Sequence, residues 1–357
     1  MTSLEQTKIL IDDVVSRTPS HMKWTWGEGL FGYALSLLDE AMGKQDYLPF
    51  LNEYGAYWAK QNPEVNSSDT SAPCLITYYL YKKTGQKEFA DLTAKGIDYL
   101  ENSPRVIADI PNHMGTSFNA HFFPASIWVD SLMMFSVFPS LYGKENHEER
   151  LLHYAAKLPL IFAQYLQDQE SGLFYHEYIA KKNKPYPRHH LFWGRGNGWV
   201  IAALPMVYAN LPEAYPEKEG ISSIYLKTFR AMMAHQNSDG SFNTLLCRKS
   251  YRELSATALF AAGAYQGLNE GILPQGGAEE EAAQKAAGAV FKSLRKNKKG
   301  HWEFPEISGP TCPLPPFPGL NYKLIPRKAN WSYGLAALIF LAVQKDAYEK
   351  LRPAKCQ

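Results

Sequence analysis

Two kinds of apolar segment, each long enough to form a helix, run along the chain. Segments of the first kind are apolar on nearly every face and rich in alanine, leucine and aromatic residues, which is typical of buried helices. They are residues 26–42, 71–84, 126–142, 196–211, 253–268 and 330–343. Segments of the second kind carry one apolar stripe and charged residues on the remaining faces, as expected of amphipathic helices packed on an inner layer. They are residues 4–16, 47–62, 87–103, 148–167, 222–237 and 279–296.

The two kinds of segment alternate, and an amphipathic segment precedes each buried one. Six antiparallel helix hairpins closed into a ring would produce this order, with buried helices as an inner barrel and amphipathic helices around it. We therefore predict an all-α fold, an (α/α)6 barrel, as a single domain over residues 1–357. An open helical solenoid is the alternative, although the repeats have irregular lengths and no common consensus. No alternation of period two is long enough to predict a sheet.

Three connections between the predicted helices are long and irregular, namely residues 62–70, 104–125 and 303–329. Loops longer than about 12 to 15 residues in a compact domain usually have a function or lack order. These connections contain aromatic residues and are stiffened by proline. We therefore expect them to be ordered around a pocket at one end of the ring.

Charge and composition exclude several classes of partner. The 37 Lys and Arg residues nearly balance the 35 Asp and Glu residues, which gives a net charge of +2. This balance argues against a nucleic-acid-binding or membrane-surface protein. The longest apolar run, residues 335–343, is about half of a membrane span, and residues 1–13 lack the apolar core of a signal peptide. Four cysteines without a CxxC pair, Cys74, Cys247, Cys312 and Cys356, favour a cytoplasmic location.

Aromatic residues make up 13% of the chain, and one string places several of them beside polar groups. Residues 192–199, Phe-Trp-Gly-Arg-Gly-Asn-Gly-Trp, form a glycine-rich turn that opens a buried segment. Arg195 can hold a carboxylate with two parallel hydrogen bonds, and Trp193 or Trp199 can stack on a sugar ring. Asn197 adds a side-chain amide. The string predicts a pocket for a sugar carboxylate, and the alternative is a packed turn in which the arginine caps helix carbonyls.

Two aspartates stand near the starts of buried segments. Asp130 lies in the string 127–134, Ile-Trp-Val-Asp-Ser-Leu-Met-Met, in the first turns of an otherwise apolar helix. Burial would raise the pKa of its carboxyl group, whereas the helix N-terminus would lower it. Asp130 is thus a candidate general acid, unless it caps a helix or pairs with an arginine. Asp69, in the string 66–73, is either an N-cap or a second pocket acid that raises the pKa of Asp130.

The histidines are less informative. His176 lies at the mouth of a predicted turn, and His121 lies within the 104–125 connection. Both are candidates for binding substrate, although a lone histidine more often lies on the surface or caps a helix. His189 and His190 are adjacent but have no third ligand at a suitable spacing, so we predict no metal and no other cofactor.

These motifs resemble those of the unsaturated rhamnogalacturonyl hydrolases of glycoside hydrolase family 105. The similar strings are residues 128–133, His176, residues 193–199 and residues 253–258, within a similarity that extends from residue 24 to residue 334. The unsaturated glucuronyl hydrolases of family 88 are more distant relatives of the same plan. Members of these families are (α/α)6 barrels, in agreement with the helix pattern. Two features depart from the family: Gly194 replaces an expected Ala or Ser, and residues 311–326 match no known pattern.

The resemblance implies that an unsaturated uronic acid is removed from an oligosaccharide by hydration of its C4=C5 double bond. Asp130 would protonate C4 and then activate the water that adds at C5. Asp69 would be the second acidic residue of the catalytic pair and would tune Asp130 or bind sugar hydroxyl groups. Arg195, Trp193 and Trp199 would hold the uronate, with His176 near its hydroxyl groups or the bridging oxygen.

Four further residues complete the expected substrate-binding set. Trp26 and Trp128 open two other buried segments, so they are expected at the same end of the barrel, and Asn197 and His121 are included with them. The expected substrate is an unsaturated galacturonyl-rhamnose, and the protein is expected to be a monomer or weak homodimer. The alternatives are an unsaturated glucuronyl hydrolase acting on glucuronan, ulvan or arabinogalactan fragments, a sugar epimerase with a histidine base, or a non-catalytic carbohydrate-binding toroid.

Overall fold

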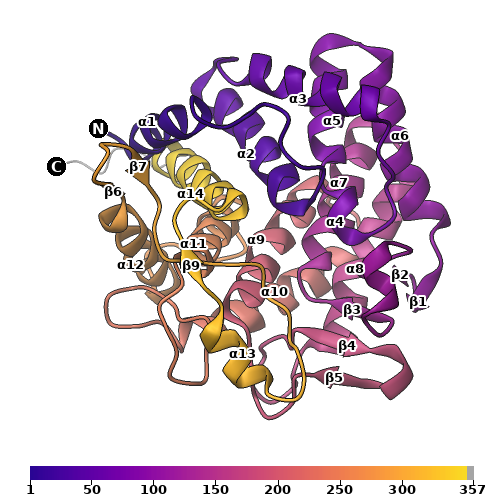
Figure 1. Cartoon of the computed structure of the whole chain (residues 1–357). Coiled ribbons are helices and arrows are strands. Elements are labelled where there is room, and N and C mark those ends of the chain that lie inside the picture. The colour runs from indigo at the N-terminus through magenta and orange to yellow at the C-terminus, as the bar shows by residue number, and fades with distance from the viewer. Residues whose placement is uncertain (352–357) are drawn as a thin grey trace.

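Six inner helices form a closed ring in the computed structural model, which describes residues 1–351 (Figure 1). They are α2 (Trp26–Met42), α5 (Cys74–Thr84), α7 (Ser131–Asn146), α9 (Gly194–Asn210), α11 (Leu254–Asn269) and α14 (Ser332–Leu351). Each packs on the next in chain order, and α14 packs back on α2. Because the last helix contacts the first, the fold is the predicted all-α (α/α)6 barrel and not an open solenoid. Cys356 lies outside the described residues.

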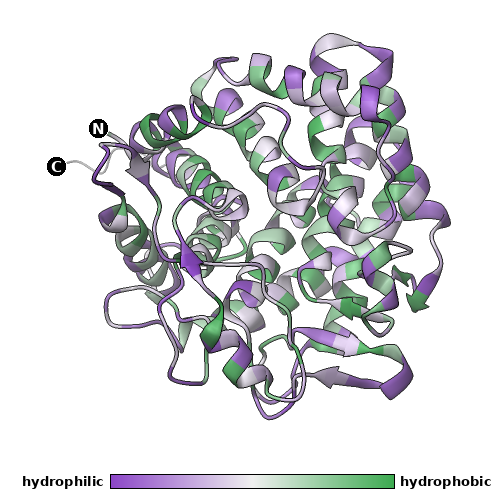
Figure 2. Cartoon of the chain, viewed as in Figure 1, coloured by the Kyte–Doolittle hydropathy of each residue, from purple (hydrophilic) through white to green (hydrophobic). Residues whose placement is uncertain are grey.

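Six outer helices surround this ring, and each packs on an inner helix. They are α1 (Ser3–Val15), α3 (Leu48–Gln61), α6 (Lys87–Asn102), α8 (Glu149–Leu166), α10 (Glu217–Met233) and α12 (Ala278–Ser293). The buried residues of α6 recur every three to four positions, starting from Phe89 and Leu92, so a single face meets the ring. The α11 helix, in contrast, is buried at every position from Leu254 to Leu268. Figure 2 shows the same difference in hydropathy between the two layers.

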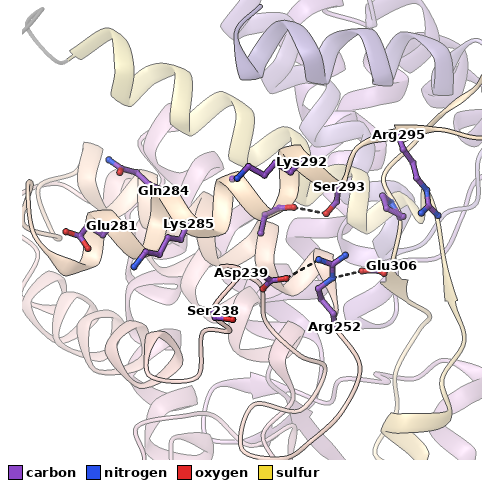
Figure 3. A pocket seen from close by; sticks show the side chains of 13 residues that line it. Ser238, Asp239, Arg252, Glu281, Gln284, Lys285, Lys292, Ser293, Arg295 and Glu306 are labelled. Carbon is purple, nitrogen blue, oxygen red and sulfur yellow. Dashed lines mark hydrogen bonds and ion pairs between the residues drawn. The ribbon is translucent and has the colours of Figure 1, made fainter. Parts of the chain in front are cut away.

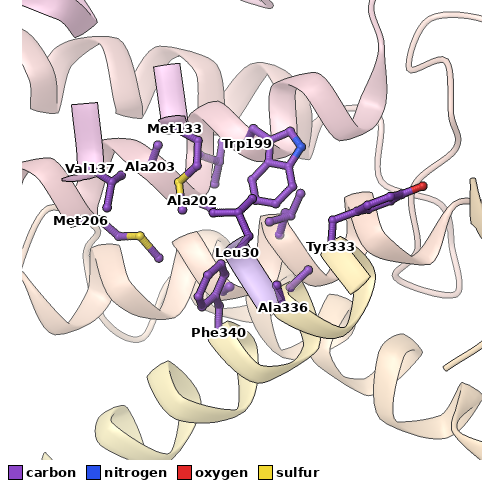
Figure 4. Packing of buried hydrophobic residues seen from close by; sticks show 14 of the residues in the cluster. Leu30, Met133, Val137, Trp199, Ala202, Ala203, Met206, Tyr333, Ala336 and Phe340 are labelled. Carbon is purple, nitrogen blue, oxygen red and sulfur yellow. The ribbon is translucent and has the colours of Figure 1, made fainter. Parts of the chain in front are cut away.

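The core fills the middle of the ring, where side chains from several inner helices meet (Figure 4). They include Leu30, Met133, Trp199, Ala203 and Phe340. Small residues let these helices approach closely. A Cβ atom on Gly263 of α11 would lie 2.1 Å from the carbonyl oxygen of Ile201 in α9, so only glycine fits at this crossing. Among residues 1–351, no helix has both the length and the apolar character needed to cross a membrane.

Short elements occupy the long connections. The helical ones are α4 (Ser68–Ser71), η1 (Phe118–His121), η2 (Ala180–Lys182) and α13 (Pro318–Leu324). The strands are β1 (Arg105–Ile107), β2 (Ile110–Pro111), β3 (Ser126–Trp128), β4 (Glu177–Ile179), β5 (Lys184–Tyr186), β6 (Arg295–Lys296), β7 (Trp302–Glu303), β8 (Ile307–Ser308) and β9 (Arg327–Lys328). These strands are two or three residues long, too short for a period of two to be seen in the sequence.

Two predicted helix starts were wrong. Residues 126–128 form strand β3, which pairs with β4, and α7 begins only at Ser131. The segment 71–84 is also divided, because α4 ends before Pro73 and α5 begins at Cys74. Proline lacks an N–H and is therefore better placed at the start of a helix than in its interior. The first correction moves Asp130 from a predicted helix interior to the start of α7, whereas Asp69, expected ahead of a helix, lies within the short helix α4.

Candidate active site

The inner helices begin at one end of the ring, where residues at their starts surround a pocket of about 240 Å³. Trp26 opens α2, Asp69 lies in α4 ahead of α5, Asp130 precedes α7, and Trp193 precedes α9. Helix N-termini carry partial positive charge and unpaired N–H groups. This end of the ring therefore favours an anionic ligand.

Six of the ten residues expected to act on or bind a substrate line this pocket. They are Trp26, Asp69, Trp128, Asp130, Trp193 and Arg195. The remaining lining residues come from two of the long connections and were not singled out in the sequence. They are His113, Met114, Asn119, Phe123, Pro310, Thr311 and Cys312. The expectation that these two connections are ordered around a pocket is confirmed.

Asp130 lies at the N-cap position of α7, between β3 and the helix. Its side chain makes no capping hydrogen bond, and its Oδ1 is buried without a partner among the described residues. Burial raises the pKa of Asp130 to about 6, while nearby backbone N–H groups and the positive charge of Arg195 act in the opposite direction. A carboxyl group that exchanges its proton near neutral pH can serve as both general acid and general base.

Asp69 faces the same pocket from α4. The N-cap of α4 is Ser67, whose side chain accepts a hydrogen bond from the N–H of Thr70, so Asp69 has no capping role. Burial, followed by the negative charge of Asp130, raises the pKa of Asp69 to about 7. Two nearby carboxyl groups resist simultaneous ionisation. The pair therefore holds about one proton between pH 6 and pH 7.

Arg195 is fully buried, and both of its terminal nitrogens are bound by the protein. Its Nη1 donates to the Ser308 carbonyl at 3.0 Å and meets Glu253 Oε1 at 3.4 Å. Its Nη2 donates to the Gly309 carbonyl and to Thr311 Oγ1, both at 2.9 Å. Arg195 and Glu253 thus hold the segment that brings Thr311 into the pocket wall.

The guanidinium of Arg195 is stacked between the rings of Trp193 and Tyr333, at 4.7 and 4.8 Å from their centroids. Within the described part of the chain only Nε lacks a hydrogen-bond partner. The alternative noted from the sequence, an arginine that caps helix carbonyls, is met only in part, because the carbonyls bound by Arg195 lie at the end of β8 and in the residue after it. Binding of a substrate carboxylate by Arg195 stays a prediction, and the contact left for it is through Nε.

Gly194 explains one departure from the family pattern. A Cβ atom at this position would lie 2.3 Å from the carbonyl oxygen of Asn243, and the Gly194 N–H donates to the Thr244 carbonyl at 2.8 Å. Any larger residue would push this backbone away. Glycine therefore keeps the start of α9, including Arg195, against the neighbouring loop.

His176 lies behind the pocket wall. It stacks on Trp193 with 4.3 Å between ring centroids, and its Nδ1 lies 2.6 Å from the hydroxyl of Tyr322. Burial, followed by the electrostatic influence of His113 and Arg195, holds the pKa of His176 well below its ordinary value. The ring is thus neutral and supports Trp193, and its Nε2 is buried without a partner in residues 1–351.

The remaining three expected site residues lie outside the pocket lining. Asn197 exchanges hydrogen bonds with both backbone groups of Phe174, at 2.7 and 3.0 Å, and so ties the turn before His176 to α9. Trp199 is fully buried in the core (Figure 4). His121 is exposed, and its Nδ1 contacts the Phe118 carbonyl at 3.1 Å. The structure gives these residues packing contacts rather than a place at the pocket surface.

The histidine of this connection that lines the pocket is His113, whereas His121 was the one expected there. It stacks face to face on Trp128 with 4.2 Å between centroids, and its Nδ1 lies 2.6 Å from Ser131 Oγ. Burial lowers the pKa of His113 to about 3, so the ring is neutral. Both histidines lie in the same irregular connection, and nothing in the local sequence separates them.

Residues 1–351 contain no group of three or more His, Cys, Asp and Glu side chains arranged to hold a metal ion. Asp69 and Asp130 share the pocket lining with aromatic side chains and with polar ones such as Asn119 and Thr311.

Comparison with known proteins identifies the family. The model of the family described as Glycosyl Hydrolase Family 88 matches residues 5–347. The chain belongs to this family. Two curated relatives are named unsaturated 3S-rhamnoglycuronyl hydrolase. The one from Alteromonas sp. (strain LOR) is 32% identical over 181 residues, which are 49% of this chain and 43% of that protein. The one from Formosa agariphila is 24% identical over 184 residues, 49% of this chain and 48% of that protein.

These matches span about half the length of the two curated relatives. A structure from Klebsiella pneumoniae, described as a possible member of the GH105 family, shares the fold with a TM-score of 0.84. It is 21% identical, and the comparison covers 96% of this chain and 93% of that one. The relationship to families 105 and 88 that the motifs indicated is confirmed.

Proposed function

We propose that this family 88 protein hydrolyses oligosaccharides that end in a Δ4,5-unsaturated uronic acid, with the pair Asp69 and Asp130 supplying acid and base. The observation that carries the proposal is the pocket pair itself. Asp130 Oδ1 has no hydrogen-bond partner among the described residues, and the two carboxyl groups have pKa values of about 6 and about 7. The curated relatives' name, unsaturated 3S-rhamnoglycuronyl hydrolase, supports this class of substrate.

The first chemical step is protonation of the vinyl ether. Asp130 in its acid form gives its proton to C4, the π electrons form the new C–H bond, and positive charge develops at C5 and the ring oxygen. Water then adds at C5 and returns a proton to the Asp130 carboxylate. The product is a hemiketal at C5, which opens by breaking the bond between C5 and the ring oxygen and leaves a ketone at C5 and a hemiacetal at C1. The hemiacetal then collapses to an aldehyde, the C1–O bond to the next sugar breaks, and the leaving oxygen takes the hemiacetal proton. Proton transfer by such a positioned group typically contributes about 10²- to 10⁴-fold.

The rest of the pocket would bind and orient the sugar. Trp26, Trp128 and Trp193 line the cavity. Because Trp193 packs on His176 and Arg195, and Trp128 stacks on His113, the sugar would contact only the ring surfaces that these groups leave open. The helix N-termini and Arg195 Nε would face the uronate carboxylate. Asp69 would hold a proton while Asp130 is ionised, because the negative charge of Asp130 raises the pKa of Asp69.

The preferred substrate is an unsaturated galacturonyl-rhamnose, and unsaturated glucuronyl oligosaccharides from glucuronan or ulvan are the alternative. The test is the ultraviolet absorbance of the C4=C5 bond in lyase-generated oligosaccharides of rhamnogalacturonan, glucuronan and ulvan. We expect the absorbance to disappear on addition of the protein with at least one of these. Unchanged absorbance with all of them would overturn the proposal.

A further inference from the structure

A cavity of about 1070 Å³ outside the active-site pocket lies along α12 (Figure 3). Its central Arg252 is bound to Glu306 at 2.7 Å and to Asp239 at 3.1 Å. Lys285 and Lys292 share the lining with these acids and with a further glutamate. Positive and negative charges thus nearly cancel there, and the cavity indicates no particular ligand.

A buried tyrosine behind the active-site pocket is more informative. Tyr322 belongs to α13, in the stretch 311–326 that matched no family pattern in the sequence. It is fully buried, and it is the one buried residue among the seven of α13. The side chains of Phe317, Leu320 and Leu324 are exposed. At about 100° of rotation per residue these three lie on one side of the helix and Tyr322 lies on the other. Tyr322 therefore anchors α13 to the body of the protein.

The Tyr322 hydroxyl and the His176 imidazole form a buried hydrogen bond. The hydroxyl oxygen lies 2.6 Å from His176 Nδ1, which is its only hydrogen-bond partner among residues 1–351. Burial, followed by the electrostatic influence of Glu177, raises the pKa of Tyr322 well above its ordinary value, so the hydroxyl keeps its proton. The His176 ring is also neutral, because burial lowers its pKa. One of these two neutral groups must donate to the other.

The direction of this hydrogen bond follows from the groups that it leaves unpaired. If the Tyr322 hydroxyl donates to Nδ1, the imidazole carries its proton on Nε2, and that N–H alone lacks a partner in the described part of the chain. If Nδ1 donates instead, the hydroxyl proton and the Nε2 lone pair both lack a partner there. Each buried polar group without a partner costs free energy. The arrangement with fewer such groups, the Nε2–H tautomer of His176, is therefore favoured.

The aromatic neighbours of His176 also suit this tautomer. The ring of Trp128 stands at 85° to the imidazole with 5.1 Å between centroids. In such a perpendicular pair an N–H can point at an aromatic face and form a weak hydrogen bond. An Nε2–H group thus has a place to donate, which a bare Nε2 lone pair does not.

His176 connects the tyrosine to the wall of the active-site pocket. Its ring stacks on Trp193 at 4.3 Å and lies against Trp128, and both tryptophans line the pocket. Its backbone carbonyl accepts a hydrogen bond from the Val129 N–H at 2.8 Å. Val129 directly precedes Asp130. A rotation of His176 would therefore disturb both tryptophans and the segment that carries Asp130.

From these contacts we infer that Tyr322 is a positioning residue for the active-site pocket. Its hydroxyl donates to His176 Nδ1, fixes the imidazole as the Nε2–H tautomer and so holds the pocket wall in place around Asp130. The expected effect on turnover rests on the proposed function. The tautomer of His176, in contrast, can be measured without any substrate.

The test uses Tyr322→Phe, which removes the hydroxyl and keeps the ring. The matched control is Tyr225→Phe. Tyr225 is also fully buried, and its hydroxyl donates to the Gly263 carbonyl at 2.8 Å, between α10 and α11. Neither Tyr225 nor Gly263 lines the pocket. Each variant loses one buried hydroxyl hydrogen bond, so a general loss of packing would affect both alike.

The first measurement is nitrogen-15 NMR of protein labelled at histidine, with the His176 signals assigned by their absence in H176Q. In the wild type we expect His176 to carry its proton on Nε2. In Y322F we expect a mixture of the two neutral tautomers, because Nδ1 has lost its donor, and in Y225F we expect the wild-type spectrum. A wild-type ring protonated on Nδ1, or an unchanged tautomer in Y322F, would overturn the inference.

The second measurement is turnover, followed by the C4=C5 absorbance of an unsaturated oligosaccharide. A reacting group that moves by about 1 Å can lose about 10²-fold in rate, so loss of one positioning hydrogen bond should lower kcat about tenfold, with KM changed less than about twofold. Y225F should keep the wild-type kcat. An unchanged kcat in Y322F, or an equal loss in Y225F, would overturn the inference.

A double variant shows whether Tyr322 acts through His176. If it does, H176Q/Y322F should turn over substrate no more slowly than H176Q, because the hydrogen bond is already lost in the single variant. A further tenfold loss in the double variant would overturn the inference. A change of tautomer in Y322F, in a protein that turns over no oligosaccharide, would support the hold of Tyr322 on His176 and contradict only the proposed function.

Discussion

Two clusters of buried charge lie side by side at the active end of the ring, and they are built in opposite ways. In the first, Glu253 accepts hydrogen bonds from Ser255 Oγ at 2.5 Å, from the Ala256 N–H at 2.6 Å and from the Ser308 N–H at 3.1 Å, and it contacts Arg195. In the second, Asp130 leaves Oδ1 without any partner in the described residues.

The difference separates structural from chemical roles. A buried charge that is fully hydrogen-bonded can stabilise its surroundings, because the lost hydration is replaced. A buried carboxyl group with too few hydrogen-bond partners holds its proton more tightly and so destabilises the fold when it ionises. Glu253 and Arg195 therefore shape the pocket, whereas Asp69 and Asp130 are left free to exchange protons.

The largest expected effect comes from Asp130→Asn. The substitution keeps the size of the side chain but removes the proton donor, so kcat should fall about 10⁴-fold, the upper end for general acid–base catalysis. Loss of absorbance at the C4=C5 band measures turnover, and tryptophan fluorescence measures substrate binding, which should persist. If kcat of the variant stayed within tenfold of the wild type, a residue other than Asp130 would be the general acid. Retained binding and biological function without turnover would favour a carbohydrate-binding toroid.

The second effect concerns the cluster of Glu253 and Arg195, whose charges are hydrogen-bonded to their surroundings. Glu253→Ala leaves the buried Arg195 without its ion pair and frees the Ala256 and Ser308 N–H groups, so the free energy of unfolding should fall by about 3 kcal/mol. Glu253→Gln keeps the acceptor oxygen and should lose less. Urea unfolding followed by circular dichroism measures both. A loss below about 1 kcal/mol for the alanine variant would show that the pair is not structural.

The third effect is a gain, rather than a loss, in the free energy of unfolding. The pKa values of Asp69 and Asp130 in the folded protein, about 7 and about 6, lie above the ordinary value of 3.8. Their ionisation therefore removes stability as the pH rises from 4 to 7. The double variant D69N/D130N should be more stable than the wild type by several kcal/mol at pH 8, since each unit of raised pKa corresponds to about 1.4 kcal/mol, and equally stable at pH 4. Urea unfolding at both pH values gives the comparison, and destabilisation at pH 8 would contradict it.

The smallest effect concerns the coupling between the two acids. Asp130→Asn removes the negative charge that raises the pKa of Asp69, so Asp69 should lose its proton at a pH below its wild-type value of about 7. Carbon-13 NMR of the aspartate carboxyl groups follows this titration. Asp168→Asn, outside the pocket, is the matched control. An unmoved Asp69 pKa in the D130N protein would show that the two carboxyl groups are not coupled.

The local pattern of apolar and polar residues was enough to locate the main helices. The one-sided apolar stripe of α6 and the all-round burial of α11 follow from residue order alone, because each helix needs only its own periodicity to be recognised. Strand β3 was missed since its three residues, Ser126–Trp128, are held by pairing with β4, about fifty residues away in the chain. Short strands stabilised by distant partners leave little local signal.

The sequence by itself determined the ring of alternating helices and the two aspartates, because amphipathic period and an acid in an apolar string are local properties. Only the tertiary structure decided which groups remain free. It bonded the Arg195 terminal nitrogens to residues more than fifty positions away, and it placed His113, not His121, against Trp128. Hydrogen-bond partners and burial depend on chain segments that are distant in the sequence. Only the folded structure therefore shows that Glu253 and Arg195 are hydrogen-bonded to their surroundings, while Asp130 keeps a carboxyl oxygen without a partner in the described residues.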